Sequence, residues 1–510
     1  IFLVYNFISY CRHDNKQMYY KSKNRSEVLM PKQQVNTSIF DFYGRPPLGK
    51  ALPLSLQHVL AMIAGVITPP IIVAGVVGAS VEERLLLIQI AVLASGASTL
   101  FQLYGVWKFG ARLPAIFGVG FAYVPTLVAV GGQYGIAGIL GAQLIGGICM
   151  MVVGYFIQYI RHLFPPVVAG TVVLVIGLSL YDIAVRYMAG SGNVEAPGFG
   201  EPLNWLVALI TLTTVLVASQ FARGVVKLSA IIVGIVVGYV LSLLLGMVSF
   251  EAVADAGWVA VPQFMPFELE FHTSAIIAMV IICVINSVQT IGDLSATTVG
   301  GMNRELKTRE LTGGLLGNGL TTTLSAFFGA LPTATFSQNV GIVAMTRVIS
   351  RFVLALAGGF MLLAGLSPKF SALVTTIPYP VLGGATIIVF GMITMTGIKL
   401  LIKDELSARN MTIVGLALAL SLGIAQVPEA IAQLPEWIQS VIGGSPIVVA
   451  AITAFTLNLV LPRVTLADEE RERERMARAD EENNCSTIQD QEAAAYSHRQ
   501  EGSAGKASNS

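Results

Sequence analysis

The chain has 510 residues, of which 54% are hydrophobic and only 12% carry a charge. A soluble protein of this length needs about 25% charged residues, so most of this chain is expected to lie in lipid. The formal net charge of +1 gives no electrostatic basis for binding nucleic acid. The four cysteines lie far apart, without disulfide or metal spacing, so we expect neither a metal nor a cofactor.

The two ends of the chain differ from its apolar middle. Residues 1–44 are expected to form a cytoplasmic N-terminal segment, part of which is an upstream extension if translation starts at Met18 or Met30. Residues 463–510 begin with a run dense in Glu and Arg and continue with small polar residues. Such a composition cannot bury a core, so the sequence predicts a polar cytoplasmic tail that is disordered or, as the alternative, loosely helical in water.

Fourteen segments are apolar enough to cross a bilayer, which takes about 20 helical residues. Several of them are short or broken by Gly and Pro, notably the third and the tenth. The sequence therefore predicts an all-α polytopic membrane protein. The fourteen expected spans are 52–76, 84–106, 113–131, 136–158, 165–187, 203–220, 228–249, 274–300, 311–330, 335–349, 351–366, 380–400, 410–427 and 445–462.

The basic residues test this count, because Lys and Arg collect in cytoplasmic loops. They occur in the N-terminal segment and after even-numbered spans, as Lys108 and Arg112 do after the second. The loops after odd-numbered spans carry few, namely Arg84, Arg186 and Lys369. We therefore expect both termini in the cytoplasm of a multi-pass protein of the inner (plasma) membrane.

Two pairs of segments resemble each other along the chain. LPAIFGVGFAYV begins at Leu113 and LPTATFSQNVGIV at Leu331, while PVVAGTVVLVIG begins at Pro166 and PVLGGATIIVFG at Pro380. The two offsets are nearly equal, 218 and 214 residues, and each pair lies seven spans apart. An odd separation reverses the orientation, which predicts two inverted repeats of seven spans, an architecture of transporters. Chance similarity between apolar segments rich in Gly and Pro is the alternative.

The third and tenth spans are the expected place of the binding site. Each is an extended stretch led by Pro and followed by a short helical run. Irregular backbone at membrane depth is tolerated only where it lines a cavity. The N-termini of the half-helices would direct bare N–H groups and positive dipole ends at a polar substrate.

Polar residues inside apolar spans are candidate site residues. Asp293 lies in the eighth span, with Gln289 one turn earlier on the same helix face. The Gln289 amide fits the imide edge of an oxopurine or uracil, and a bridge between helices is the alternative. Asp293 and His58 are candidates for proton coupling. The alternative for Asp293 is that it ends the helix at the membrane interface, and the alternative for His58 is that its side chain only hydrogen-bonds to backbone.

The breaks of the third and tenth spans add further candidates. Gln338 and Asn339 occupy the break in the tenth span. Phe121 and Phe336, at the matching breaks of the third and tenth spans, can stack on a planar ring, and core packing is the alternative. Arg347 closes the tenth span, where it could instead be an ordinary interfacial anchor.

These residues resemble a known family. The run QNVG at 338–341, followed by Thr346-Arg347, resembles the signature of the nucleobase–ascorbate transporters, and Gln57-His58 resembles their motif in the first helix. Asp293 fits the eighth span of the family. The resemblance covers about residues 45–465 and is of the bacterial xanthine, uric acid or uracil permease type. The residues that support the motif are Gln57, Gly341, Thr346 and Arg347.

The resemblance implies two domains that move against each other. A core domain would comprise residues 45–158 (spans 1–4) and 274–366 (spans 8–11). A gate domain would comprise residues 159–250 (spans 5–7) and 380–462 (spans 12–14), and it would make a homodimer contact. Substrate would bind between short strands in spans 3 and 10.

The resemblance also implies which residues bind the base. Bacterial members are typically proton symporters for uracil, xanthine or uric acid. The family usually has Glu where this chain has Gln289, and Gln cannot titrate, so coupling would fall to Asp293 and His58 or be altered. Gln338 favours a purine, because uracil carriers tend to have Glu there. The substrate-binding residues implied are Phe121, Ala122, Gln289, Phe336, Ser337, Gln338 and Asn339.

The sequence thus predicts a secondary transporter that imports a nucleobase, a purine such as xanthine or uric acid, with protons. A uracil permease of the same family and an inverted-repeat anion transporter are the alternatives. We expect no enzyme and no catalytic residue, because H-E-x-x-H, G-x-S-x-G and a phosphate-binding Gly loop are missing from the sequence. The expected partners are the substrate, protons, the bilayer and a second copy of the chain.

Overall fold

The structure is a computed structural model that describes residues 37–160, 165–435, 438–443, 445–462 and 464–479. Residues 1–36 of the expected N-terminal segment, and most of the expected tail, lie outside this part. Residues 466–479 of the expected tail form a largely exposed helix. Two Glu–Arg pairs spaced four residues apart, Glu469 with Arg473 and Glu474 with Arg478, support that helix.

Within the described residues, eight helical segments are long and apolar enough to span a membrane. A ninth is formed by α14 (Arg351–Gly365) and α15 (Pro368–Thr375) if this pair, bent by 82°, counts as one span. The prediction of a mostly helical multi-pass protein is therefore confirmed. The eight segments consist of α2 (Leu48–Val76), α3 (Val81–Tyr104), η1 (Phe121–Tyr123) with α4 (Val124–Ile160), α5 (Pro166–Ser179) with α6 (Tyr181–Met188), α7 (Pro202–Phe221), α11 (Thr273–Ala296) with η3 (Thr297–Gly301), α16 (Tyr379–Leu401) and α17 (Ala408–Gln426).

Further helices lie in the remaining apolar segments and in the loops, so each of the fourteen predicted spans contains helix. Two of them, α9 (Ala230–Leu244) and α19 (Pro446–Val460), are apolar but short. The others in these spans are α12 (Thr308–Phe327) and α13 (Ser337–Thr346). The loops add α8 (Gly224–Leu228), α10 (Glu251–Asp255), η4 (Pro428–Ile431) and η5 (Gln439–Gly443).

Two short strands interrupt the third and tenth segments, as expected. β1 (Phe117–Val119) pairs antiparallel with β2 (Thr333–Thr335), with Gly118 opposite Ala334. Backbone hydrogen bonds beyond the strands continue the ladder, because the Phe336 N–H donates to the Ile116 carbonyl at 3.1 Å. The pairing brings together two segments that lie more than 200 residues apart in sequence.

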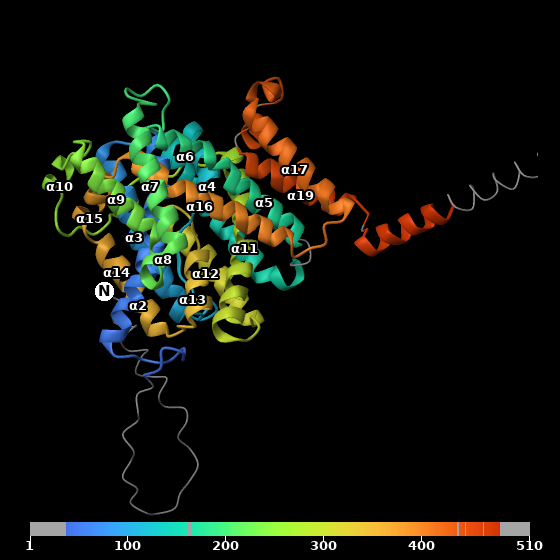
Figure 1. The fold of residues 1–510 in the computed structure, drawn as a ribbon, viewed down its shortest axis with the longest axis horizontal. Helices are drawn as coiled ribbons and strands as arrows, with labels where there is room; N and C mark the ends of the chain where they lie inside the picture. Colours follow the sequence, from blue (N-terminus) through green and yellow to red (C-terminus); the bar gives the residue numbers. More distant parts are fainter. Residues whose placement is uncertain (1–36, 161–164, 436–437, 444, 463, 480–510) are drawn as a thin grey trace, which may run out of the picture. The chain divides into compact units, whose positions relative to one another are not determined.

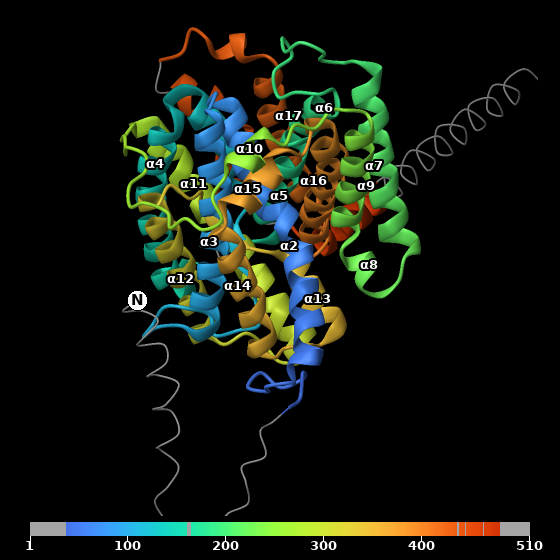
Figure 2. The ribbon, with the colours of Figure 1, turned by 90° about the vertical axis from the view of Figure 1, so that its left-hand side faces the viewer.

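The same packing contacts recur seven segments apart along the chain. α4 packs on α11 and α12, and, correspondingly, α14 packs on α2 and α3. α7 packs on α9 as α17 packs on α19, and Figure 1 shows α17 and α19 side by side. In Figure 2, α7 and α9 lie on the opposite side of the molecule from α4, α11 and α12. α5 and α16, which occupy equivalent places in the two proposed repeats, pack on each other.

Small residues allow the closest of these helix contacts. A Cβ on Gly319 of α12 would lie 2.8 Å from the Gly147 carbonyl oxygen of α4. A Cβ on Gly397 of α16 would lie 2.4 Å from the Leu174 nitrogen of α5. Membrane helices associate mainly through such close backbone approach, because lipid offers no hydrophobic drive between them. Larger residues at these glycines would push the helix pairs apart.

Two local breaks shape the long segments. Gly135 has φ 65° and ψ −166°, a conformation open to glycine, and it breaks α4 between the expected third and fourth spans. The expected fifth span is divided at Leu180 into α5 and α6. The first break agrees with the sequence prediction, and the second was not anticipated.

Candidate functional site

Asp293 lies where α11 meets the end of β2, and it is only partly buried. Its carboxylate accepts hydrogen bonds from the Thr335 hydroxyl and from the Ser337 hydroxyl, the latter at 2.8 and 3.0 Å to its two oxygens. The Gln289 side chain lies next to the same carboxylate. A carboxylate at membrane depth costs a few kcal/mol unless it has partners or faces a cavity. Here it has hydroxyl partners and an exposed side.

The N-terminus of α13 begins next to this carboxylate. Phe336 precedes the helix in an extended conformation and, within the described residues, no side chain caps the first turn. The backbone N–H groups of Ser337 and Gln338 therefore lie at the positive end of the helix dipole. Both side chains are half-buried. An uncapped helix start of this kind favours a group that accepts hydrogen bonds, and its use as the substrate site stays a prediction.

Asn339 connects the broken segment to α2 through His58. Its amide Nδ2 lies 3.1 Å from Nδ1 of His58 and donates to the His58 backbone carbonyl at 3.0 Å. Because an amide nitrogen only donates, Nδ1 accepts, and the proton of a neutral His58 sits on Nε2. Both residues are buried, with 1% of the surface exposed. The structure thus joins Asn339 and His58, while within the described residues no hydrogen bond or ion pair joins His58 to Asp293.

The two predicted aromatic residues lie next to the same glycine. A Cβ on Gly65 of α2 would lie 2.6 Å from the Phe336 ring and 3.6 Å from the Phe121 ring. Phe121 also contacts Phe390 of α16 edge to face, with 5.4 Å between ring centroids. Phe121, Ala122 and Phe336 are buried. The two rings therefore lie close enough to border one planar ligand, and Phe121 reaches across to α16.

Sequence reasoning missed the polar residues that hold β2 in place. The Thr333 hydroxyl donates to the Asn318 Oδ1 at 2.9 Å and lies 2.9 and 3.1 Å from the hydroxyls of Thr321 and Thr322. The signal was present in the TAT sequence of the strand. Alternate residues of a strand face the same side, so Thr333 and Thr335 both point toward helices. One bonds to α12 and the other to Asp293.

The remaining motif residues have structural contacts. Arg347 ends α13 in the left-handed conformation, with φ 56°, and Thr346 accepts from the Val348 N–H at 3.3 Å. A Cβ on Gly341 would meet nothing within 4 Å, so close packing does not require this glycine. Gln57 is buried, and Arg347 is exposed. Of these residues, Thr346 and Arg347 thus shape the end of α13.

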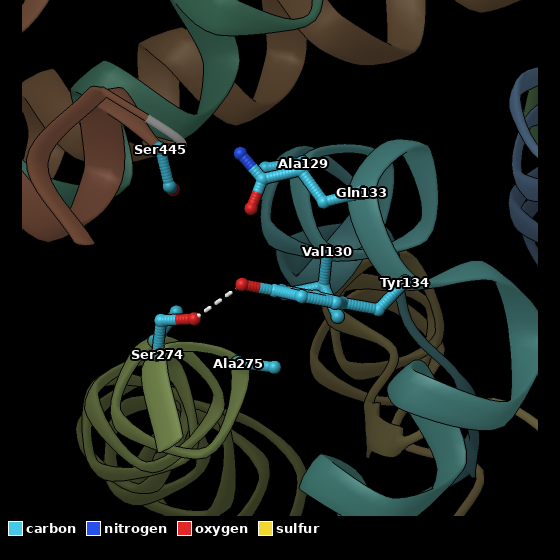
Figure 3. Close-up of a pocket in the computed structure, with 8 residues that line it drawn as sticks. Ala129, Val130, Gln133, Tyr134, Ser274, Ala275 and Ser445 are labelled. Atoms are coloured by element: carbon cyan, nitrogen blue, oxygen red, sulfur yellow. Dashed lines mark hydrogen bonds between the residues drawn. The ribbon is translucent and has the colours of Figure 1, made fainter. Parts of the chain in front are cut away.

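A separate small cavity lies between α4, α11 and the start of α19 (Figure 3). Its volume of about 10 Å³ is room for about one water molecule. The Tyr134 hydroxyl lies 2.7 Å from the Ser274 hydroxyl on its wall. The residues that line it include none of the predicted site residues, so it is not the candidate substrate site.

Comparison with known proteins identifies the family. Residues 49–430 match the model of a permease family. The chain belongs to this family, the nucleobase–ascorbate transporters. It is 35% identical to a xanthine permease of Bacillus subtilis (strain 168), over 82% of this chain and 94% of the relative. It is 36% identical to the uric acid permease PucK of the same strain, over 79% of this chain and 94% of that protein. A match to the xanthine permease XanP of Escherichia coli (strain K12), at 30% identity, covers 86% of this chain and 98% of XanP.

Solved structures show the same fold at low sequence identity. The transmembrane domain of the cyanobacterial bicarbonate transporter BicA matches with a TM-score of 0.52 and 17% identity, covering 79% of this chain and 97% of that chain. The murine anion transporter Slc26a9 in its inward-facing state matches with a TM-score of 0.51 and 11% identity, covering 89% of this chain and 75% of that chain. At these identities the likeness establishes the fold alone.

Proposed function

We propose that this permease imports a nucleobase, a purine such as xanthine or uric acid, by proton symport with alternating access. The observation that carries the proposal is the partly buried Asp293 beside the uncapped start of α13, in a family whose members include xanthine and uric acid permeases. A carboxylate inside a membrane segment is by default a functional group.

The base would bind between the two broken segments. Its ring would lie along Phe121 and Phe336, and its polar edge would face Gln289 and the first turn of α13. The Gln289 amide offers one acceptor and two donors, which suits an oxopurine edge that has both. Ala122, Ser337, Gln338 and Asn339 complete the proposed site, with Asn339 positioning the segment through His58.

Proton coupling would use Asp293, because it is the carboxylate at this site. Ser337 and Thr335 are hydroxyl donors that can follow either protonation state of the carboxylate by rotation. Gln289 cannot titrate. His58 is the second proposed member of the coupling system, acting on α13 through Asn339.

Alternating access would come from motion of a core domain against a gate domain. We assign spans 1–4 and 8–11 to the core and spans 5–7 and 12–14 to the gate, in two inverted repeats of seven. The recurrence of helix contacts seven segments apart supports this division, as does the antiparallel pairing of β1 with β2. Phe121 against Phe390 of α16 would then be a contact that changes during transport. A homodimer would form through the gate domain in the inner (plasma) membrane, with both termini cytoplasmic.

Uptake into proteoliposomes tests the proposal. Radiolabelled xanthine, urate, uracil and guanine are supplied with an imposed proton gradient, with and without a protonophore. We expect a purine to accumulate and the protonophore to abolish its accumulation. Purine uptake that ignores the protonophore would refute symport, and uptake of uracil alone would refute the purine assignment. Competition by bicarbonate would point instead to an anion transporter.

A further inference from the structure

Three basic residues occupy the loops that are expected to face the periplasm, where Lys and Arg are disfavoured. Two of them have partners. Arg186 pairs with Asp182 at 2.8 Å, and Lys369 lies 4.8 Å from the centroid of the Trp258 ring. The side chain of the third, Arg84, forms neither a hydrogen bond nor an ion pair with any described residue, and its Nε is buried without a partner. A buried N–H donor without an acceptor costs about 1–3 kcal/mol, so Arg84 calls for an explanation.

Arg84 faces a cavity of about 240 Å³ between segments of the proposed core and gate domains. Drug-sized ligands occupy pockets of about 300–1,000 Å³, so this cavity suits a smaller molecule of one or two rings. Among the described residues that line it there is no carboxylate to neutralise the guanidinium. The lining residues that matter here are Ile71, Arg84, Ser249, Thr375, Thr376 and Tyr379.

The backbone adds positive potential to the same cavity. Arg84 lies in the first turn of α3, whose cap is formed by Ser80 and Glu83. Tyr379 is the first residue of α16, which begins after Pro378 without a side-chain cap in the described structure. The start of α3 is already capped, and Glu82 and Glu83 make its first turn acidic, so only the uncapped start of α16 favours an anion in the cavity. Neither of these carboxylates lines the cavity.

The two threonine hydroxyls that line the cavity already donate elsewhere, whereas the Arg84 Nε–H has no acceptor. The Thr375 and Thr376 hydroxyls already donate to the Ala372 and Leu373 carbonyls, at 2.8 and 2.7 Å. The Tyr379 ring lies 4.8 Å from the Tyr187 ring, measured between centroids. An aromatic wall beside a guanidinium suits a flat anion better than a spherical one.

We propose that this cavity is an outer binding site for the anionic form of an oxopurine, with Arg84 as the residue that selects its charge. The inference rests on the proposed function, because the anion is a form of the proposed substrate. Ile71 of the cavity and Gly65, beside Phe121 and Phe336, are six residues apart on α2, or about 9 Å along the helix. Measured along α2, the outer site thus lies within two helical turns of the proposed inner site.

The test compares a charged and an uncharged base in the full-length chain. Uric acid is largely ionised at neutral pH, whereas guanine is uncharged. We expect Arg84→Gln to raise the KM for urate about tenfold, equivalent to about 1.4 kcal/mol, and to leave the KM for guanine unchanged. Arg84→Lys, which keeps the charge, should retain most of the preference for urate. Equal effects on both bases, or none on urate, would overturn the proposal.

A matched control separates a local site from general electrostatics. Arg186→Gln removes one positive charge from the same predicted side, but from a residue already paired with Asp182. We expect no change in urate uptake from this variant. If Arg186→Gln weakens urate uptake as much as Arg84→Gln does, surface charge explains the effect and the outer site is refuted. Competition with urate by phosphate or bicarbonate at equal concentration would likewise refute selection of a purine anion.

Equilibrium binding distinguishes failure of this inference from failure of the proposed function. Binding of radiolabelled urate to the purified protein, measured by scintillation proximity, needs no transport. Binding that is lost in Arg84→Gln but kept in Arg186→Gln supports the site, even if no uptake occurs and the symport proposal fails. If the wild-type protein takes up a purine but Arg84→Gln binds urate as well as the wild type does, the outer site is refuted and the proposed function is not.

Discussion

Replacing Asn339 with Ala should nearly abolish uptake while leaving the protein folded in the membrane. The substitution removes two hydrogen bonds from the amide, at 3.1 Å to His58 Nδ1 and 3.0 Å to the His58 carbonyl. Hydrogen bonds between membrane helices contribute about 0.6 kcal/mol on average and at most about 1.7 kcal/mol. The Asn339 Oδ1 has no partner among the described residues, so its loss adds no cost. The expected destabilisation is about 1–2 kcal/mol.

That loss is small for the whole protein but large for the position of α13. The helix has only ten residues, and the Asn339 amide is what ties its first turn to α2. A free-energy change of about 1.4 kcal/mol raises the ratio of misplaced to correctly placed α13 about tenfold. This shift lowers uptake by up to about tenfold, and the loss of Asn339 as a proposed binding residue lowers it further.

The assay is initial uptake in proteoliposomes, normalised to folded protein, together with thermal unfolding of the purified variant. Asn204→Ala is the matched control, because the Asn204 amide also donates two hydrogen bonds, to the carbonyls of Ala189 at 3.1 Å and Gly198 at 2.9 Å. Those bonds lie in the α6–α7 connection, far along the chain from the site. The control should lose comparable stability and keep normal uptake.

Two results would refute this reasoning. Near-normal transport by Asn339→Ala would remove the His58–Asn339 contact from the mechanism. A loss of uptake in Asn204→Ala as large as that in Asn339→Ala would mean that general destabilisation, rather than the placement of α13, limits transport.

Three further predictions test the proton, the base and the topology. Asp293→Asn should abolish concentrative uptake, and unchanged accumulation driven by a pH gradient would place the coupling elsewhere. Gln289→Glu should change the relative affinities for xanthine, urate, uracil and guanine, measured by competition, by about five- to hundredfold. The change should favour bases whose edge offers two donors, since a mismatched buried hydrogen bond costs about 1–3 kcal/mol. If Gln289→Ala and Gln289→Glu both keep the wild-type competition profile, Gln289 has a packing role and does not contact the base. In a cysteine-free background, Ala260→Cys should be labelled from the periplasm and Glu305→Cys from the cytoplasm, and the reverse pattern would contradict the fourteen-span model.

Much of the fold followed from the lengths and spacing of the apolar segments. The expected boundary between the third and fourth spans coincides with the break at Gly135, because a left-handed glycine and the end of an apolar run mark the same point. The division at Leu180 was missed, because the expected span 165–187 was drawn through Asp182 and Arg186 without a Pro to mark the break. The short helices α8, α10 and α15 were also missed, because eight or fewer residues give no readable periodicity.

The site was predictable residue by residue but not contact by contact. Asp293 and Asn339 stood out because a polar side chain in an apolar segment is costly. Their partners did not, because Thr335 lies 42 residues from Asp293, and Asn339 lies 281 residues from His58. Only the strand pairing and the packing of α2 against α13 set these contacts, and neither is encoded in a local pattern. Arg84 was noted as a basic residue in an odd-numbered loop, but the sequence could not reveal that it lacks a partner.

The two proposed sites suggest how charge is balanced during transport. An oxopurine anion that moves from Arg84 to the inner site would meet a second negative charge at Asp293 if that carboxylate were ionised, and the two would repel. A proton on Asp293 removes the repulsion, so anion and proton would enter the inner site together as a neutral pair. Moving a net charge against the membrane potential costs about 2.3 kcal/mol per 100 mV, whereas a neutral pair avoids that cost. On this argument, Arg84 chooses the ionised base and Asp293 makes its passage independent of the potential. The proton requirement then arises from the substrate's own charge, which explains how one titrating carboxylate can suffice where Gln289 cannot contribute a second.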